Sequence, residues 1–221
     1  MIDNVITITM DDGKANALGP DMQRELADAL DAAEAARAGV VLAGRAGRFS
    51  GGFDLGVIAG GGADAAAMIR GGFELSARLL SFATPVVIAC TGHAVAMGSF
   101  LLLSGDYRVG AAGPFKIQAN EVAIGMTMPH AALALVRGRL APAHADRAAI
   151  TSEAYTPETA VDAGFLDRLV QPDDVVATAQ SVAASFMPLD AAAHAATKLR
   201  ARADTLQAIR DGIAAEFPDR S

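Results

Sequence analysis

The stretch TPVVIACTGHAVAMGSFLLLSGDYRVG, residues 84–110, carries the pattern that decides the fold. PVVIAC is a short apolar run with β-branched residues, which predicts a buried strand. A turn at TGHA follows, and AMGSFLLLSG predicts a helix that begins near Met97. DYRVG then predicts a second short strand. A strand, a helix and a strand in this order indicate an α/β unit.

The same region contains an uncharged window, residues 85–105, that is long enough to be tested as a membrane span. Thr91, Gly92, His93 and Gly98 interrupt this window, so we reject the interpretation. The N-terminal sequence MIDNVITITMDDG has no basic stretch followed by an apolar block, and it therefore does not resemble a signal peptide. We expect a soluble, cytoplasmic protein.

Composition limits the partners that the chain can have. Its 221 residues are 52% hydrophobic and carry a net charge of -7, which suits one large domain with an acidic surface. Such a surface repels phosphate backbones, so we do not expect nucleic acid as a partner. Cys90, the single cysteine, lies in an apolar run and is expected to be a core residue. No residues have metal-ligand spacing, so we predict no metal site.

Strands and helices alternate along most of the chain. VITITM, Val5–Met10, predicts a half-buried strand, and a helix follows from Asp21 to about Gly39. The remaining expected segments are a strand at residues 40–44, a glycine-rich loop at 44–56, a flexible loop turning helical over 60–83, a strand or loop at 116–125, helices at 129–138, at 142–150 and from 157, a strand at 165–170, and helices beyond 173. The sequence thus predicts an α/β core domain over residues 1–172 and a helical C-terminal segment over residues 173–221.

The glycine-rich loop and the helix near Met97 both offer backbone N–H groups to a ligand. In RFSGGFDLG, residues 48–56, Gly51 and Gly52 permit a turn that aims N–H groups at a ligand oxygen, and Asp54 suits a cap for the following turn. The first N–H groups of the helix have no acceptor within it, so they suit an anion or a polarised carbonyl. An ordinary turn and an ordinary core helix remain the alternatives.

Glu121 is the only charged residue between Lys116 and Arg137. It lies in NEVAIGMTMP, residues 120–129, where its neighbours are mostly apolar. Desolvation there would disfavour the ionised carboxylate and raise its pKa towards that of a useful general base. The alternative is a carboxylate at the rim of a loop that points to water.

Together these stretches resemble the crotonase superfamily, also called the enoyl-CoA hydratase/isomerase family. Residues 48–56 are similar to the family's first oxyanion-hole loop, residues 84–110 to its second, and residues 120–129 to the segment with a catalytic glutamate. KANAL, residues 14–18, is similar to the early loop that touches the nucleotide end of CoA. The four motifs occur in the family's order. The resemblance implies an α/β fold with a crotonase-like spiral of strand–strand–helix units and a helical C-terminal part.

The resemblance also implies roles for single residues. Phe53 and Met97 would donate backbone N–H groups to a thioester oxygen, each typically worth about 2.7–4 kcal/mol, and Glu121 would be the catalytic carboxylate. The implied substrate-binding residues around them are Lys14, Ala15, Asn16, Gly51, Gly52, Asp54, Gly98 and Phe100. The partner would be an acyl-CoA thioester, in which CoA is part of the substrate and no separate cofactor is needed. The implied assembly is a homotrimer or a dimer of trimers.

One position departs from the family's hydratases, which use two glutamates to hold and activate a water. The first of these would fall on Phe100, which can neither accept nor donate a proton. One carboxylate suits a reaction in which a single base removes a proton beside the thioester and returns it to the far carbon. We therefore expect isomerisation of a 3-enoyl-CoA to a 2-enoyl-CoA. Hydration, with a water positioned by Glu121 alone or by a stand-in carboxylate such as Glu74, and acyl-CoA binding without catalysis remain alternatives.

Overall fold

The structure, a computed structural model, describes residues 4–217 and contains two parallel sheets. The larger sheet has the strand order β1-β2-β4-β6-β8, and all of its neighbouring strands are parallel. Its strands are β1 (Val5–Met10), β2 (Gly39–Gly44), β4 (Val86–Cys90), β6 (Tyr107–Ala111) and β8 (Arg168–Val170). The smaller sheet consists of β3 (Gly47–Ser50), β5 (Gly92–Val95) and β7 (Ile117–Gln118).

Helices follow most of the strands, and together they confirm the predicted α/β class. The α-helices are α1 (Pro20–Ala35), α2 (Leu55–Gly60), α3 (Gly62–Ser81), α4 (Met97–Leu103), α5 (His130–Arg139), α6 (Pro142–Thr151), α7 (Pro157–Ala163), α8 (Val175–Phe186), α9 (Ala191–Ala201) and α10 (Ala203–Glu216). Two short 3-10 helices are η1 (Val122–Ile124) and η2 (Pro172–Asp174). Between residues 4 and 217, none of the helices has both the length and the apolar character that a membrane span requires.

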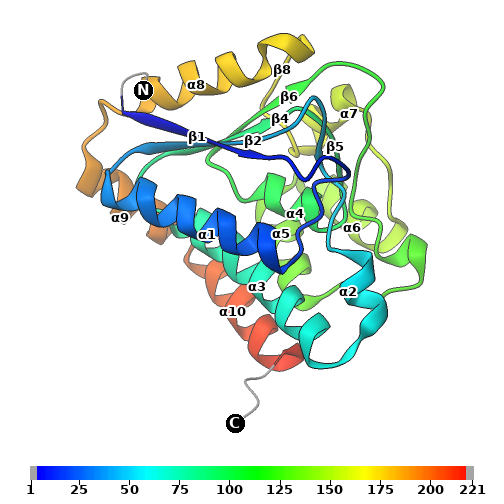
Figure 1. Cartoon of the computed structure of the whole chain (residues 1–221). Coiled ribbons are helices and arrows are strands. Elements are labelled where there is room, and N and C mark those ends of the chain that lie inside the picture. The colour runs from blue at the N-terminus through cyan, green and yellow to red at the C-terminus, as the bar shows by residue number, and fades with distance from the viewer. Residues whose placement is uncertain (1–3, 218–221) are drawn as a thin grey trace.

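Helices cover both faces of the larger sheet. Because successive residues of a strand point to opposite faces, Val41 and Val87 pack with residues of α8, whereas Leu42 and Ile88 pack with residues of α1 and α3. Figure 1 shows α8 along one side of the sheet and α1, α3 and α10 on the other. Burial of both faces explains why the strands are apolar almost throughout, as is typical of parallel sheets.

The C-terminal helices pack back onto the core through a buried ion cluster as well as through apolar contacts. Lys198 Nζ lies 2.6 Å from Asp106 Oδ2, and Arg202 Nη1 lies 2.8 Å from Asp106 Oδ1. Lys198 also donates a hydrogen bond to the carbonyl of Phe82, near the end of α3. The cluster joins α9 and the start of α10 to the segment that precedes β6. The predicted boundary at residue 172 and the predicted trimer stay predictions.

The strands β3 and β5 and the helix α2 were not expected from local sequence patterns, whereas β7 lies in the segment 116–125 that was expected to be a strand or a loop. The predicted glycine-rich loop at residues 44–56 contains β3 and the start of α2, and the predicted turn at TGHA, residues 91–94, overlaps most of β5. The expected flexible start of residues 60–83 is wrong, since α3 is helical from Gly62. A Cβ atom on Gly92 would overlap the backbone of Gly47, so β3 and β5 can approach this closely only with glycine at this contact. Glycine has a low strand propensity, and this is why the sequence pattern did not predict these strands.

The ion cluster gives a prediction about stability. Asp106→Asn removes the carboxylate shared by Lys198 and Arg202, and loss of one partner of a buried ion pair typically costs about 3–5 kcal/mol. We expect a decrease of this size in the free energy of unfolding, measured by urea denaturation. Asp21→Asn is the control, because Asp21 and its partner Arg24 have side chains that are 83% and 65% exposed, and the expected change is below about 1 kcal/mol. Equal effects of the two substitutions would contradict the role given to the cluster.

Candidate active site

The smaller sheet brings the predicted catalytic segments to one edge. Its neighbouring strands β3, β5 and β7 are parallel, so their carboxyl ends lie at the same edge. Phe53 lies three residues beyond the end of β3, Met97 two beyond the end of β5, and Glu121 three beyond the end of β7. Ligands of open α/β sheets bind in the crevice outside the carboxyl ends of the strands. The edge of the smaller sheet is therefore the candidate active site.

The loops that follow β3 and β5 touch each other at Gly52. A Cβ atom on Gly52 would lie 2.8 Å from Ala96 Cβ and 3.4 Å from the backbone nitrogen of Met97. Gly52 also has a φ of 103°, a conformation that side chains other than glycine's rarely adopt. The backbone nitrogen of Met97 thus lies beside Gly52, which is the residue that precedes Phe53. The two predicted N–H donors are neighbours in space.

Hydrogen bonds fix the peptide group between Ala96 and Met97. The Ala96 carbonyl accepts from the N–H of Ser99 at 2.8 Å and from its hydroxyl at 2.7 Å, and Ala96 N–H donates to Gln118 O at 2.9 Å. In a trans peptide the N–H points opposite to the C=O, so Met97 N–H is directed away from the first turn of α4. Within residues 4–217, neither Met97 N–H nor Phe53 N–H donates a hydrogen bond to another protein group. Both are available to a ligand oxygen.

Backbone strain accompanies this arrangement. Ala96 has a φ of 50° and a ψ of -128°, a region that residues other than glycine seldom occupy. Such residues persist only where the surrounding structure over-determines their conformation, and they cluster at functional sites. Ala96 and Ser99 were not predicted as site residues, because left-handed backbone at an alanine leaves no signal in the sequence.

Two of the predicted substrate-binding side chains are used within the protein. Asp54 Oδ1 accepts from the N–H groups of Gly56 at 2.7 Å and Val57 at 3.3 Å, and so caps α2 as predicted. Asn16 is fully buried, and its amide donates to the carbonyls of Met10 and Phe49. The polar atoms of these side chains therefore already have partners that hold the loops in place, and the substrate-binding role given to the two residues stays a prediction.

The KANAL loop lies alongside the glycine loop. Gly51 N–H donates to Ala15 O at 2.8 Å, and Leu18 N–H donates to Gly52 O at 2.7 Å. Ala15 and Gly51 therefore take part through their backbones, in a contact between the two loops. The side chain of Lys14 is exposed at this position, so it remains a candidate for contact with a phosphate of CoA.

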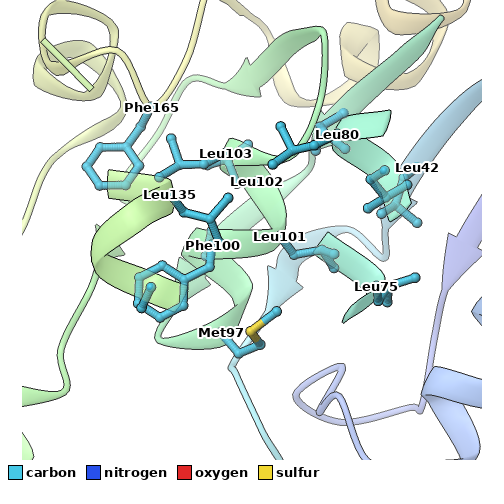
Figure 2. Packing of buried hydrophobic residues seen from close by; sticks show 14 of the residues in the cluster. Leu42, Leu75, Leu80, Met97, Phe100, Leu101, Leu102, Leu103, Leu135 and Phe165 are labelled. Carbon is cyan, nitrogen blue, oxygen red and sulfur yellow. The ribbon is translucent and has the colours of Figure 1, made fainter. Parts of the chain in front are cut away.

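Gly98 and Phe100 follow Met97 in α4, and both are buried against other parts of the chain. A Cβ atom on Gly98 would lie 2.9 Å from the carbonyl carbon of Ser50, so this glycine permits α4 to pack on β3 rather than on a ligand. Phe100 is 1% exposed, and Figure 2 shows its ring and the Met97 side chain among buried apolar side chains. This face of α4 packs in the core, and the predicted role of the two residues in substrate binding stays a prediction.

Glu121 is buried although its neighbours are not. Its exposure is 6%, whereas Val122 and Ile124 are 44% and 56% exposed, the reverse of the usual preference. Burial raises the pKa of the Glu121 carboxyl to about 7. Within residues 4–217, the buried Oε2 of Glu121 and Oδ1 of Asn120 have no hydrogen-bond partner. Unpartnered buried oxygens on two consecutive residues suit a site that accepts a ligand. The alternative of a rim carboxylate that points to water is wrong, because Glu121 is buried.

Ser152 anchors the segment that carries Glu121, and sequence reasoning missed it. Its hydroxyl accepts from Ala123 N–H at 3.1 Å, and its carbonyl accepts from the amide of Gln118 at 2.7 Å. Ser152 is itself buried and has a φ of 50°. It lies about 30 residues beyond the segment it supports, so no local pattern could have found it.

Glu74, the predicted stand-in for a second catalytic carboxylate, forms an ion pair with Arg70. Its Oε1 lies 2.7 Å from Arg70 Nε, and its side chain is 52% exposed. It lines a groove of about 790 Å³ between α1, α2 and α3. The carboxylate is thus paired with a cation and faces that groove, which disfavours a role beside Glu121.

Comparison with known proteins places these features in context. A profile of the family described as enoyl-CoA hydratase/isomerase matches residues 2–217. The chain is 52% identical to an enoyl-CoA hydratase from Mycobacterium marinum, with a TM-score of 0.93 over 97% of this chain and 96% of that one. An enoyl-CoA isomerase from Mycobacterium tuberculosis is 52% identical, with a TM-score of 0.92 over 97% and 96% of the two chains. Human mitochondrial delta3-delta2-enoyl-CoA isomerase is 26% identical, with a TM-score of 0.88 over 96% and 87%.

The raised pKa of Glu121 predicts how stability depends on pH. Between about pH 4.5 and 7, the folded chain keeps a proton that the unfolded chain has released, so stability falls as pH rises through this window. Glu121→Gln removes the ionisation, and we expect the variant to be more stable than the wild type at pH 8, by up to about 3 kcal/mol, but not at pH 4.5. Urea denaturation at the two pH values measures the difference.

Glu25→Gln, on the exposed side of α1, is the control for this experiment. It is expected to change stability by a similar small amount at both pH values. An equally small, pH-independent effect of Glu121→Gln would show that the carboxylate is solvated.

Proposed function

Because the chain belongs to the enoyl-CoA hydratase/isomerase family and has its crotonase-like fold, we propose that it converts a 3-enoyl-CoA to a 2-enoyl-CoA. The observation that carries the proposal is the buried carboxylate of Glu121 at the edge where, within residues 4–217, the N–H groups of Phe53 and Met97 have no partner. The human relative is named for this reaction and the Mycobacterium marinum relative is named a hydratase, so the family alone does not decide between the two activities.

In the proposed reaction the thioester oxygen accepts hydrogen bonds from Phe53 N–H and Met97 N–H. Ionised Glu121 removes a proton from C2, and the electron pair of that C–H bond delocalises onto the thioester oxygen as an enolate. The enolate then re-forms the carbonyl, a double bond forms between C2 and C3, and the electrons of the C3–C4 double bond take the proton back from Glu121 at C4. The carboxylate is regenerated, and no water or redox partner is needed. Developing charge on the oxygen makes the two donors stronger in the transition state than in the ground state.

The environment of Glu121 suits this proton transfer. A group with a pKa of about 7 can accept a proton and return it at neutral pH without a large energetic bias in either direction. Phe100, which occupies the position of the hydratases' other glutamate, offers no group that could hold a water. Its burial beside Phe73 also keeps the wall of the site apolar.

Hydration of a 2-enoyl-CoA is the second candidate function. The hydratase name of the Mycobacterium marinum relative favours it, at 52% identity. Glu121 would then have to activate a water alone, because Glu74 is paired with Arg70. Hydration is therefore expected to be the slower activity of this chain.

The test compares turnover of a 3-enoyl-CoA and of a 2-enoyl-CoA by purified protein. We expect isomerisation in the wild type and a fall in kcat of about 10²–10⁴-fold in Glu121→Gln, the usual contribution of a general base. Glu74→Gln is the matched control and is expected to stay within about twofold of the wild type. Since Glu121 must be ionised to act, kcat/KM is expected to fall as pH drops below about 7.

Two results would contradict the proposal. Hydration of the 2-enoyl-CoA that is faster than isomerisation and depends on Glu121 would make the protein a hydratase. Binding of both thioesters without turnover of either would make it a non-catalytic acyl-CoA-binding member of the family.

A further inference from the structure

The ring of Phe53 docks on the backbone of α3 at Gly72. A Cβ atom on Gly72 would lie 2.5 Å from Cε1 and 2.7 Å from Cζ of this ring, closer than real side-chain carbons approach. The ring therefore occupies space that any residue other than glycine would fill. Phe53 is also the residue whose N–H is one of the two proposed donors.

Three aromatic rings connect the two donor segments through α3. The ring centroid of Phe53 lies 6.2 Å from that of Phe73, in an edge-to-face arrangement, and the centroid of Phe73 lies 6.1 Å from that of Phe100. Phe100 belongs to α4, the helix that begins at Met97. Phe73 and Phe100 are almost completely buried, so they form a rigid support.

The position of Phe53 depends on this support. Its chain neighbours are Gly52, which allows the backbone to turn, and Asp54, which caps α2. A displaced ring would rotate or shift the backbone between these two residues and move the Phe53 N–H. A misplacement of about 1 Å at a reacting group can cost about 10²-fold in rate.

We propose that Gly72 is a positioning residue, whose missing Cβ lets the Phe53 ring dock on α3 and so aligns the Phe53 N–H with that of Met97. This inference rests on the proposed function, since it assigns Gly72 a part in aligning the oxyanion donors. The neighbouring Gly71 does not contact the Phe53 ring. A Cβ atom there would meet the amide end of Gln23, which donates to the carbonyls of Leu18 and Met68, so Gly71→Ala displaces a hydrogen-bonded side chain without touching the ring.

The adjacent glycines supply a matched pair of variants. Gly71→Ala and Gly72→Ala make the same change on the same helix, with the same gain in helix propensity. We expect Gly72→Ala to lower kcat for the 3-enoyl-CoA at least about tenfold, with KM within about twofold, and Gly71→Ala to leave both within about twofold. Equal kcat values for wild type and Gly72→Ala would overturn the inference.

A double-mutant cycle tests whether the effect runs through the ring. Leucine lacks the Cε1 and Cζ atoms that meet Gly72, so in the Phe53→Leu background Gly72→Ala is expected to change kcat by less than about twofold. A loss in that background as large as in the wild type would overturn the inference. If Gly72→Ala does not fold, recovery of folding in the double variant supports the inference, and failure to recover overturns it.

A readout independent of turnover separates this inference from the proposed function. The amide resonances of Phe53 and Met97 in ¹H–¹⁵N spectra of the ligand-free protein are expected to shift in Gly72→Ala and not in Gly71→Ala. If the wild type turns over no enoyl-CoA, the proposed function fails, and these shifts still decide whether Gly72 sets the backbone at Phe53. Unmoved resonances together with normal turnover would leave the proposed function standing without the inference.

Discussion

The contact between Gly52 and Ala96 is the constraint on which the proposed chemistry depends. Both residues have positive φ values, and a Cβ atom on Gly52 would lie 2.8 Å from that of Ala96. Backbone donors cannot be adjusted by side-chain rotation, so their direction depends on how the chain is held. The parallel pairing of β3 with β5 brings the loops together, and the hydrogen bonds from Ser99 fix the second one. Strain at the contact is thus offset by regular structure next to it.

Burial of the Glu121 carboxylate lowers the stability of the folded state. Ionised Glu121 at neutral pH lacks a cation or hydrogen-bond donor at its Oε2 within residues 4–217, so the folded state is less stable than it would be with a neutral side chain. The apolar residues after it lie at the surface, and Ser152 holds the segment in this orientation. The chain therefore gives up stability to keep a base with a pKa near neutrality. Such conflicts between local preference and global fold are expected at functional sites.

The sequence predicted the larger sheet and most helices, because their signals are local. β2 and β4 are continuous apolar runs bounded by glycine or proline, and α1 repeats apolar residues at helical spacing. In the smaller sheet, β3 and β5 escaped prediction, since they have four residues each and contain glycines that depress strand propensity. β7 has two residues and lies in a segment that was expected to be a strand or a loop. Pairing between such short strands is set by distant parts of the chain, and this pairing is what brings the catalytic segments together.

The candidate site was predicted in part, and mainly through resemblance to the crotonase superfamily. Phe53, Met97 and Glu121 lie at one edge as the resemblance implied. Asn16 and Asp54 were expected to bind substrate, which stays a prediction, and the structure shows that their side chains hold the loops. A polar residue next to a glycine-rich loop can serve either purpose, and only its hydrogen-bond partners decide. Gly72 and Ser152 act across long sequence separations, where a single sequence offers no signal.

The most direct test of the account is a crystal structure of the protein with an unreactive acyl-CoA analogue that keeps the thioester carbonyl. The account predicts that this oxygen lies about 2.7–3.1 Å from the nitrogens of both Phe53 and Met97, with a carboxylate oxygen of Glu121 about 3–3.5 Å from the carbon next to the carbonyl. A carbonyl that contacts neither nitrogen, or a Glu121 carboxylate directed away from the bound acyl group, would contradict it.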